Sequence, residues 1–254
     1  MVIDLNSDLG EGYGAWTMGD DDALLNIVTS ANVACGFHAG DPQVMRHTVA
    51  TAARSGVAVG AHVSYPDRRG FGRYDLKLPP SEVTNDVLYQ MGALDAFARA
   101  SGTRVSYVKP HGALYNRIAI DADLASAVVA AVREYDRGLA LLTLPGSAAA
   151  EAAEAAGIPV IAEGFADRAY TPDGHLVPRR EPGAVLTDPG LVAARAVRMA
   201  TEHTVTAIDG TDVPMPVASL CVHGDSPGAV SLAQAVRSGL TAAGVTIAPF
   251  GPVR

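Results

Sequence analysis

Short runs of β-branched and apolar residues alternate along this sequence with longer segments of helical periodicity. Strands are predicted over residues 2–6, 29–35, 57–62, 105–109, 139–143, 158–163, 217–222 and 245–249. Apolar residues at i, i+4 spacing indicate helices between them, as in Leu124, Val128 and Val132 and in Leu232, Val236 and Leu240. Alternation over seven or eight such units predicts a parallel sheet, because parallel strands need long, usually helical, connections. In a chain of 254 residues, a single closed (β/α) barrel fits this pattern better than an open sheet.

Prolines and glycines mark the predicted helix ends. Three helices are expected to begin where a capping residue precedes proline, at Asp41-Pro42, Asp188-Pro189 and Ser226-Pro227. Helical stretches are expected to end just before four glycines, at Gly56, Gly102, Gly157 and Gly244. Because no repeat, linker or low-complexity tract divides the chain, we expect residues 1–254 to form one catalytic domain.

The charge balance narrows the classes of function. With 19 basic and 27 acidic residues the net charge is −8, and the chain has no basic run that would bind nucleic acid or an anionic membrane. No apolar stretch reaches the roughly 18 residues of a membrane span, and Met1-Val-Ile-Asp lacks the basic start of a secretory signal. These features predict a soluble, cytoplasmic protein.

Polar residues that can do chemistry follow the predicted strands. Five segments carry them: Asp4-Leu-Asn6-Ser-Asp8-Leu-Gly-Glu11, Cys35-Gly-Phe-His38-Ala-Gly-Asp41, His62, Lys109-Pro-His111 and His223-Gly-Asp225. The carboxyl ends of parallel strands share one rim, where binding sites form. The five segments would therefore deliver histidine, aspartate, asparagine and lysine to one place, which is typical of an enzyme.

The first of these segments places three polar residues on one face of a strand. Asp4, Asn6 and Asp8 alternate, and at a barrel mouth such groups bind a cation or act as acid and base. Turn formation and helix capping explain one acid there but explain three poorly. Gly10-x-Gly12-x-x-Ala15 imitates a dinucleotide fingerprint, but Asp8 and Glu11 would lie against the pyrophosphate. The chain also has no Walker loop, so any nucleotide must bind in another way.

The strand-end histidines and Lys109 leave several roles open. His38 could act as a base or a metal ligand, while Asp41 caps the following helix. Asp8, His38 and His62 could together hold a divalent metal, although their spacing matches no recognised local motif. Lys109 could form a Schiff base, neutralise a carboxylate or hold a phosphoryl oxygen.

The two cysteines and the remaining histidines give weaker indications of function. Cys35 and Cys221 are expected to be buried apolar filler rather than nucleophiles. His47 and His203 lie in helical stretches and receive no role, and the role of His175, in a long connection, stays open.

Two long connections leave the same rim as the histidines. Residues 63–80 and 164–187 contain clustered arginines, namely Arg68, Arg69, Arg73, Arg168, Arg179 and Arg180. Long connections without their own structure are usually functional or disordered, and guanidinium groups bind carboxylate or phosphate through paired hydrogen bonds. We therefore expect these loops to cover an anionic substrate, although solvated surface charge explains any single arginine at least as well.

Six blocks of the sequence closely resemble the LamB/YcsF family, whose members are A subunits of 5-oxoprolinase. They are Asp4-Leu-Asn-Ser-Asp-Leu-Gly-Glu11, Ala31-Asn-Val-Ala-Cys-Gly-Phe-His-Ala-Gly-Asp41, Gly60-Ala-His-Val-Ser-Tyr-Pro-Asp67, Val108-Lys-Pro-His-Gly-Ala-Leu-Tyr115, Glu163-Gly-Phe-Ala-Asp-Arg-Ala-Tyr170 and Val222-His-Gly-Asp225. The resemblance covers essentially the whole chain, and the order of the blocks is specific.

The resemblance implies a fold, an activity and partners. The fold is a (β/α) barrel of the glycoside hydrolase/deacetylase type. The activity is ATP-dependent opening of the 5-oxo-L-proline lactam to L-glutamate, with release of ADP and phosphate, in a hetero-complex with 5-oxoprolinase subunits B and C. ATP with Mg²⁺ is then the expected cofactor, and a divalent metal at the barrel mouth is a further candidate.

The chemistry of the strand-end residues suggests roles for them in the reaction that the resemblance implies. Catalytic roles are expected for Asp8, His38, Asp41, His62, Lys109 and His111, with Asp4 as another candidate base. Substrate binding is expected for Asn6, Glu11, Arg68, Arg73, Asp167, Arg168, Tyr170, His223 and Asp225. Two alternatives stay open: a metal-dependent deacetylase or amidohydrolase that acts without ATP, and a non-catalytic subunit that binds the substrate for a partner.

Overall fold

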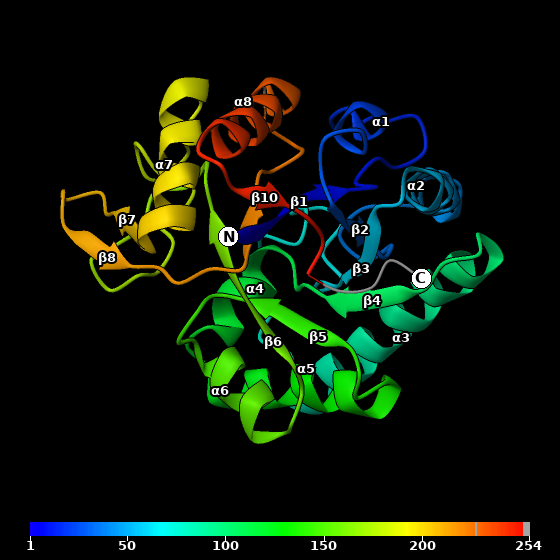
Figure 1. Ribbon diagram of the computed structural model, residues 1–254. Coiled ribbons are helices and arrows are strands. Elements are labelled where there is room, and N and C mark those ends of the chain that lie inside the picture. Colours follow the sequence, from blue (N-terminus) through cyan, green and yellow to red (C-terminus); the bar gives the residue numbers. More distant parts are fainter. Residues whose placement is uncertain (227, 251–254) are drawn as a thin grey trace.

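The computed structural model describes residues 1–226 and 228–250, and seven of its strands close into a parallel barrel (Figure 1). They are β1 (Val2–Leu9), β2 (Ser30–Ala34), β3 (Ala58–His62), β4 (Val105–Val108), β5 (Ala140–Thr143), β6 (Val160–Phe165) and β9 (Ser219–Cys221). Each pairs in parallel with the next, and β9 pairs with both β6 and β1, which closes the ring. A further strand, β10 (Thr246–Ile247), pairs with the start of β1 outside it. The predicted (β/α) barrel is confirmed.

Helices surround the barrel. They are α1 (Asp21–Leu24), α2 (Pro42–Ser55), α3 (Pro80–Ala100), α4 (Gly112–Ile118), α5 (Ala122–Tyr135), α6 (Ala148–Ala155), α7 (Pro189–Glu202) and α8 (Ala229–Ala242). The apolar stripes predicted on α5 and α8 are buried, as expected. All eight predicted strands occur, and the antiparallel pair β7 (Thr204–Thr206) and β8 (Asp212–Pro214) was not predicted.

The helix ends follow the capping residues in most places. Asp41 caps α2 through the amides of Gln43 and Val44, and Asp188 caps α7. The four predicted glycines all lie at or just past helix ends with φ between 67° and 75°. The start predicted at Ser226-Pro227 is wrong, because α8 begins at Ala229 after the cap residue Gly228, and Pro227 lies outside the described residues.

Alternation along β1 explains how the barrel separates polar from apolar side chains. Ile3, Leu5 and Leu9 pack in the apolar core between strands and helices, whereas the intervening Asp4 and Asn6 are buried and hydrogen-bond to polar side chains of neighbouring barrel strands. Because β1 continues to Leu9, three residues beyond the predicted end, Asp8 also lies on the strand rather than after it.

A large side chain fills the barrel below these groups. Tyr107 on β4 is fully buried and donates a hydrogen bond from its hydroxyl to Asn32 Oδ1 at 2.7 Å. Gly60 on β3 makes room for it, since a Cβ at that position would overlap the Tyr107 ring. The barrel is therefore closed beneath its polar layer.

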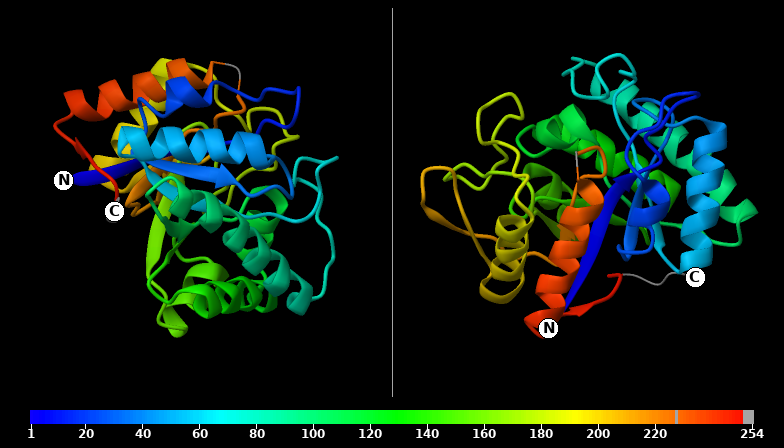
Figure 2. Two further views of the ribbon diagram at one scale, coloured as in Figure 1. Left: turned by 90° about the vertical axis from the view of Figure 1, so that its right-hand side faces the viewer. Right: turned by 90° about the horizontal axis from the view of Figure 1, so that it is seen from above.

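The long connections gather at one end of the barrel. In the left panel of Figure 2 the N-terminus lies at one end, and the loops around residues 10–20 and 63–80 project from the other. Residues 164–187 are partly ordered by pairing, because Arg168 pairs with Val185 and Tyr170 with Leu176. Within residues 1–226 and 228–250, no helix has the length and apolar character needed to cross a membrane.

Candidate functional site

The polar face of β1 begins deep in the barrel with Asp4. Its carboxylate accepts hydrogen bonds from Thr29 Oγ1 at 2.7 Å, Ser30 Oγ at 2.6 Å and Ser219 Oγ. Burial raises the pKa of Asp4 to about 6, although the three hydroxyl donors oppose this shift. All three hydroxyls donate to Asp4, and Asp4 therefore supports the polar side chains that lie above it in the barrel.

Asp8 ends the polar face near the mouth of the barrel. Its Oδ1 accepts hydrogen bonds from Asn32 Nδ2 at 2.8 Å and Lys109 Nζ at 2.9 Å, and its Oδ2 lies 3.4 Å from His62 Nε2. Burial would raise the pKa of Asp8, but the electrostatic interactions with His62 and Lys109 outweigh it and hold that pKa well below its ordinary value. Asp8 is therefore a carboxylate.

Lys109, at the end of β4, lies between two carboxylates. Its Nζ is 2.9 Å from Asp8 Oδ1 and 2.8 Å from Glu163 Oε1, and the side chain is almost fully buried. Burial favours the neutral amine, but the negative charges, above all that of Asp8, raise the pKa of Lys109 well above its ordinary value. A Schiff base needs a free amine, so this site favours charge neutralisation or anion binding instead.

His62 and His111 face each other at the mouth. His62 Nδ1 donates to the carbonyl of Lys109 at 2.9 Å, and His111 Nε2 donates to the carbonyl of Phe71 at 2.9 Å. The other two nitrogens, His62 Nε2 and His111 Nδ1, lie 2.9 Å apart. Phe71 has a φ of 55°, a strained value for a residue with a Cβ, and its backbone holds the carbonyl on His111.

Glu11 and His38 lie behind this pair. His38 Nε2 is 3.1 Å from Glu11 Oε1, and the His38 ring stacks on His111 with centroids 3.9 Å apart. Burial and the negative charge of Asp8 raise the pKa of Glu11, and burial lowers the pKa of His38 and of His111. Glu11, His38, His62 and His111 place one potential ligand atom each within 4.8 Å of one another, so this is where a metal ion could bind.

A second histidine site lies across the mouth. His223, just after β9, directs Nδ1 to both oxygens of Asp167 at 3.0 Å, and its backbone amide donates to the same carboxylate at 3.2 Å. Because a carboxylate only accepts, Nδ1 carries the proton and Nε2 is left free to accept one. The pairing is the geometry of a histidine oriented by an aspartate for proton transfer.

A cavity of about 1020 Å³ opens above these groups. Asp8, His62, Lys109, His111 and His223 line it. So do six arginines, namely Arg69, Arg73, Arg117, Arg168, Arg179 and Arg180. Together with Lys109 they face the carboxylates of Asp8 and Asp75, which makes the cavity cationic in a protein of net charge −8. Such a wall suits an anionic ligand.

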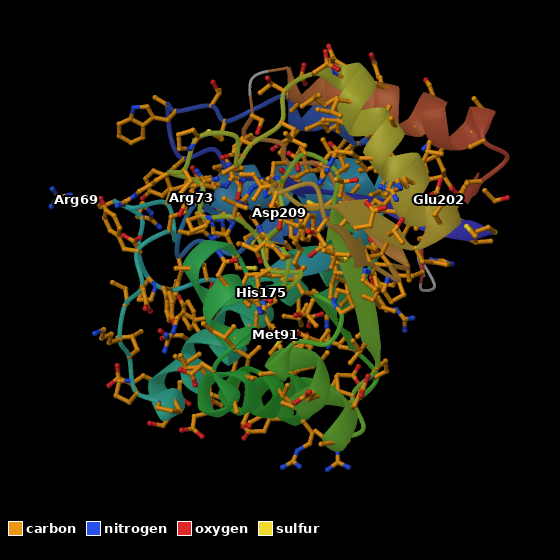
Figure 3. All side chains as sticks on the ribbon, turned by 90° about the vertical axis from the view of Figure 1, so that its left-hand side faces the viewer. Arg69, Arg73, Met91, His175, Glu202 and Asp209 are labelled. Atoms are coloured by element: carbon orange, nitrogen blue, oxygen red, sulfur yellow. The ribbon has the colours of Figure 1, made fainter. Side chains whose placement is uncertain are left out.

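The two arginine loops meet over this cavity. Arg73 Nη2 lies 2.5 Å from Asp225 Oδ2, and Arg179 lies 3.9 Å from the other oxygen of Asp225. Figure 3 shows Arg69 at the edge of the molecule and Arg73 lying further inward. Asp225 therefore holds arginines of both loops in place, and its carboxylate is engaged by them rather than by the substrate.

Several predicted site residues have other duties. Asp41 does not line the cavity, since its carboxylate caps α2 and accepts from Gly14 N at 2.7 Å. Arg68 donates to the carbonyl of Gly36 and lies over the Tyr13 ring, outside the cavity. Tyr170 is fully buried, and its hydroxyl accepts from Phe165 N at 2.7 Å.

Asn6 and Arg168 are also engaged by the protein itself. Asn6 donates to Ser219 Oγ at 2.7 Å and accepts from Asn32 Nδ2 at 2.7 Å, beneath the cavity. Arg168 lines the cavity but is largely buried and donates to the carbonyls of Val177 and Ala184, which tie its loop together. Burial lowers the pKa of Arg168 to about 10.

Sequence reasoning missed three residues of the site. Glu163 contacts Lys109, Asn32 contacts Asp8, and Arg179 faces Asp225 from the second loop. Glu163 and Asn32 lie inside strands, where a lone polar residue in an apolar run was the available signal. Arg179 was one of the clustered arginines but was not selected.

Neither cysteine adds a reactive group at the mouth, and the remaining histidines differ in position. Burial raises the pKa of Cys35 to about 12 and that of Cys221 well above its ordinary value, so neither forms a ready thiolate. His47 is exposed and contacts Asp22, and His175 lies on the wall of the cavity.

Comparison with known sequences gives matches along nearly the entire chain. The model of the LamB/YcsF family matches residues 3–254. A protein from Streptomyces griseus, named as the A subunit of 5-oxoprolinase, is 58% identical over 249 residues, which cover 98% of this chain and 100% of that protein. A protein from Agrobacterium fabrum, named as the first of its 5-oxoprolinase A subunits, is 57% identical over 253 residues, covering 100% and 99% of the two chains.

Solved structures give the same picture for the fold. The lactam utilization protein from Thermus thermophilus superimposes with a TM-score of 0.93 at 47% identity, covering 98% of this chain and 100% of that one. A family 4 carbohydrate esterase from Streptomyces lividans has a TM-score of 0.51 at 12% identity, with 99% and 93% covered. The latter likeness concerns the barrel alone and agrees with the deacetylase-type architecture.

Proposed function

The chain belongs to the LamB/YcsF family, and from this we propose that it acts as the A subunit of a 5-oxoprolinase. In this proposal it takes part in ATP-dependent hydrolysis of the 5-oxo-L-proline lactam to L-glutamate, with release of ADP and phosphate. The names of the Streptomyces griseus and Agrobacterium fabrum relatives and of the lactam utilization protein support the substrate class. Because the first two names describe one subunit of an enzyme, they also support a hetero-complex, for which we propose 5-oxoprolinase subunits B and C as partners.

The cationic cavity is the observation that carries the proposal. A five-membered lactam is a stable amide, and phosphorylation of its oxygen by ATP would turn that oxygen into a leaving group. The substrate then bears both a carboxylate and a phosphoryl group, and two anions need several cationic partners. Six arginines and Lys109 line one cavity, more than a carboxylate alone would need.

The buried groups can supply the proton transfers of such a hydrolysis. His223, held by Asp167 at 3.0 Å, presents Nε2 as the acceptor of a proton from water. Lys109 stays an ammonium and can hold an oxygen of the substrate from the floor of the cavity, with Asp8 and Glu163 fixing its position. ATP with Mg²⁺ remains the proposed cofactor of the assembled enzyme.

A second candidate function has support from one observation. The pair of His62 and His111 beside Glu11 resembles a metal-binding arrangement and would suit an amidohydrolase that needs no ATP. A third candidate, a subunit that only binds 5-oxoproline for its partners, is compatible with the missing Walker loop.

The deciding experiment measures glutamate and phosphate release from 5-oxo-L-proline with Mg-ATP. It compares this protein alone, the candidate B and C subunits alone, and all three together. We expect coupled release of glutamate and phosphate only with all three. Glutamate release should be lost with His223→Gln but not with His47→Gln, an exposed histidine that does not line the cavity.

Two outcomes would overturn the proposal. Glutamate release by this protein without ATP would favour the amidohydrolase. Full activity of the complex with His223→Gln, Lys109→Met and Asp8→Asn variants, each folded and each binding 5-oxoproline, would favour the binding subunit.

A further inference from the structure

The protons of His62 and His111 are fixed by two backbone carbonyls. His62 Nδ1 lies 2.9 Å from the carbonyl oxygen of Lys109, and His111 Nε2 lies 2.9 Å from that of Phe71. A carbonyl oxygen cannot donate, so each of these outer nitrogens must carry a hydrogen. In neutral rings the inner nitrogens, His62 Nε2 and His111 Nδ1, then hold only lone pairs, and they face each other at 2.9 Å. Two lone pairs repel at this distance unless a proton or a metal ion lies against them.

Glu11 completes a triangle around the same point. Its Oε1 lies 3.4 Å from His111 Nδ1 and 3.8 Å from His62 Nε2. Together with the 2.9 Å between the nitrogens, these distances define a triangle whose three corners are all about 2.0 Å from one point, the length of a zinc–imidazole or zinc–carboxylate bond. A shared proton would engage only the two nitrogens, whereas a metal ion at this point would engage all three corners of the triangle.

His38 belongs to the surroundings of this point rather than to its ligands. Its ring is stacked on His111, with 3.9 Å between the centroids and 8° between the planes. An imidazole binds a metal in the plane of its ring, so an ion in the plane of His111 lies well outside that of His38. His38 Nε2 instead lies 3.1 Å from Glu11 Oε1 and positions that carboxylate, as outer partners of metal ligands commonly do.

We propose that His62 Nε2, His111 Nδ1 and Glu11 Oε1 bind one divalent transition-metal ion, with His38 positioning Glu11. Two imidazoles and one carboxylate suit Zn²⁺, Fe²⁺ or Co²⁺, whereas Mg²⁺ and Ca²⁺ prefer oxygen ligands alone. The outward hydrogen bonds of both histidines to carbonyls are the contacts that fix the tautomer of metal-binding histidines.

The site would present its ion to the substrate cavity. His62 and His111 line the cavity, whereas Glu11 and His38 lie behind them, so protein closes one side of the ion and the cavity leaves the other side open. A further carboxylate oxygen, Asp8 Oδ2, lies 3.4 Å from His62 Nε2. An ion there could contact an oxygen of any bound substrate. The inference rests on the ligand geometry and stands whichever reaction the cavity serves.

Metal content of the purified protein tests the proposal without any activity assay. The metal-free protein is prepared with a chelator, incubated in turn with Zn²⁺, Co²⁺ and Fe²⁺, desalted, and analysed by elemental mass spectrometry. We expect about one ion per chain for at least one of these metals. Retention of none of the three would overturn the proposal and leave a shared proton between the two histidines.

Variants then test the ligand set. His62→Ala, His111→Ala and Glu11→Gln should each lose stoichiometric binding, whereas the control His47→Gln should bind like the unaltered protein. His38→Ala should still bind, with affinity reduced about 10–100-fold, the usual effect of removing an outer partner. Unchanged binding in the first three variants would overturn the site.

X-ray absorption of the metal-loaded, unaltered protein decides the case where a variant fails to fold. Two imidazoles and at least one carboxylate oxygen around the ion would support the proposal. Three imidazoles would overturn the ligand set by making His38 a ligand, and sulfur around the ion would place the metal elsewhere.

Discussion

The ammonium nitrogen of Lys109 lies 2.8 Å from a carboxylate oxygen of Glu163, at a depth where neither side chain meets solvent. Neither Glu163 oxygen has a well-aligned hydrogen-bond donor among the described residues, so the contact is mainly electrostatic. With Asp8 on its other side, one buried cation serves two carboxylates. Removing that cation would leave two buried carboxylates without the positive charge that they share.

This arrangement predicts unequal effects for the two ends of the pair. Lys109→Met should destabilise the protein by about 3–5 kcal/mol, the usual cost of breaking a buried ion pair from one side. Glu163→Gln should cost less, about 1–3 kcal/mol, because Lys109 keeps Asp8. Urea unfolding of both variants and of the double variant measures this. Strictly additive effects in the double variant would show that the two groups are not coupled.

Asp4 predicts a dependence of stability on pH. Burial raises its pKa in the folded protein to about 6, from 3.8 in an unfolded chain. Since the folded state holds the proton more tightly, its contribution to stability is fully present below about pH 4 and is lost as the pH rises through about 6. The shift corresponds to about 3 kcal/mol at most. Asp4→Asn removes this dependence, so the variant should gain stability relative to the unaltered protein as the pH rises from about 4 to 7.

Unfolding measured across that pH range checks the prediction for Asp4. Asp209 supplies the comparison, because its hydrogen bonds with Thr211 lower its pKa and it is fully exposed. Asp209→Asn should lose stability relative to the unaltered protein as the pH rises through the acid range, the opposite direction, and by less. A stability difference between Asp4→Asn and the unaltered protein that stays constant with pH would contradict the assignment.

The residues at the strand ends could be predicted from the sequence. Their buried partners within strands, and the pairs formed between distant segments of the chain, could not. Asp8, His62 and Lys109 could be grouped because parallel strands end at one rim, and in the folded chain they lie within hydrogen-bonding or ion-pair distance. Glu163 was missed because its strand position gives no hint of which carboxylate faces Lys109. The contact of Arg73 with Asp225 joins residues 152 positions apart, and no local pattern encodes such a distance.

Two predicted site residues have other contacts for a physical reason. Asp41 was expected to be catalytic and Tyr170 to bind the substrate, because both lie in blocks that contain other candidate functional residues. Both side chains instead bind backbone amides that would otherwise have no partner. Asp41 caps the start of α2, and the Tyr170 hydroxyl accepts a hydrogen bond from Phe165 N. Which partner a side chain binds depends on where it points, and that is set by tertiary structure.

Gly72 should be intolerant of any side chain because of the histidines beside it. A Cβ there would lie 2.8 Å from His111 Cδ2, 2.9 Å from His38 Cβ and closer still to Ser64 Oγ. Gly72→Ala should therefore displace His38 and His111. Turnover should fall by more than the loss of folded protein explains. Gly146 is the matched control, with the same φ of 66° and no atom within 4 Å of its Cβ position.

Comparing the two alanine variants separates backbone strain from steric displacement. Both should lose about 1 kcal/mol of stability from the left-handed backbone. The additional loss in Gly72→Ala, and its effect on turnover of the assembled complex, measures the clash. Equal stability and equal turnover in the two variants would show that the histidines can move aside without affecting folding or turnover.

Tyr170→Phe should weaken the fold and spare the substrate site. The lost hydroxyl accepts a hydrogen bond from Phe165 N at 2.7 Å, so its removal leaves a buried amide without a partner. The cost expected for such an amide is about 1–3 kcal/mol. Because Tyr170 does not line the cavity, KM for 5-oxoproline should be unchanged at a temperature where the variant is folded. A raised KM with unchanged stability would return Tyr170 to the substrate.

The pairing of Asp167 with His223 predicts the sharpest separation of function from folding. Asp167 holds the proton of His223 on Nδ1 through contacts of 3.0 Å, and the electrostatic and hydrogen-bond interactions with His223 keep the pKa of Asp167 low despite burial. Asp167→Asn keeps the shape of the side chain but lets its amide donate to Nδ1, which moves the proton of His223 to Nε2. A base protonated on the nitrogen that faces the cavity cannot accept a proton from water, so kcat should fall about 10²–10⁴-fold. KM should change little, because Asp167 does not line the cavity.

A second aspartate controls for the substitution itself. Asp41→Asn makes the same chemical change at the cap of α2. The asparagine oxygen still caps the helix but its amide nitrogen cannot accept from Gly14 N, so stability should fall modestly while kcat stays close to that of the unaltered protein. Steady-state kinetics of the complex with each variant, alongside thermal unfolding, gives the comparison. If Asp167→Asn retained kcat while Asp41→Asn abolished it, the proton-transfer site would lie at the start of α2 and not at His223. Because Asp41 spends both carboxylate oxygens on backbone amides, we expect the reverse.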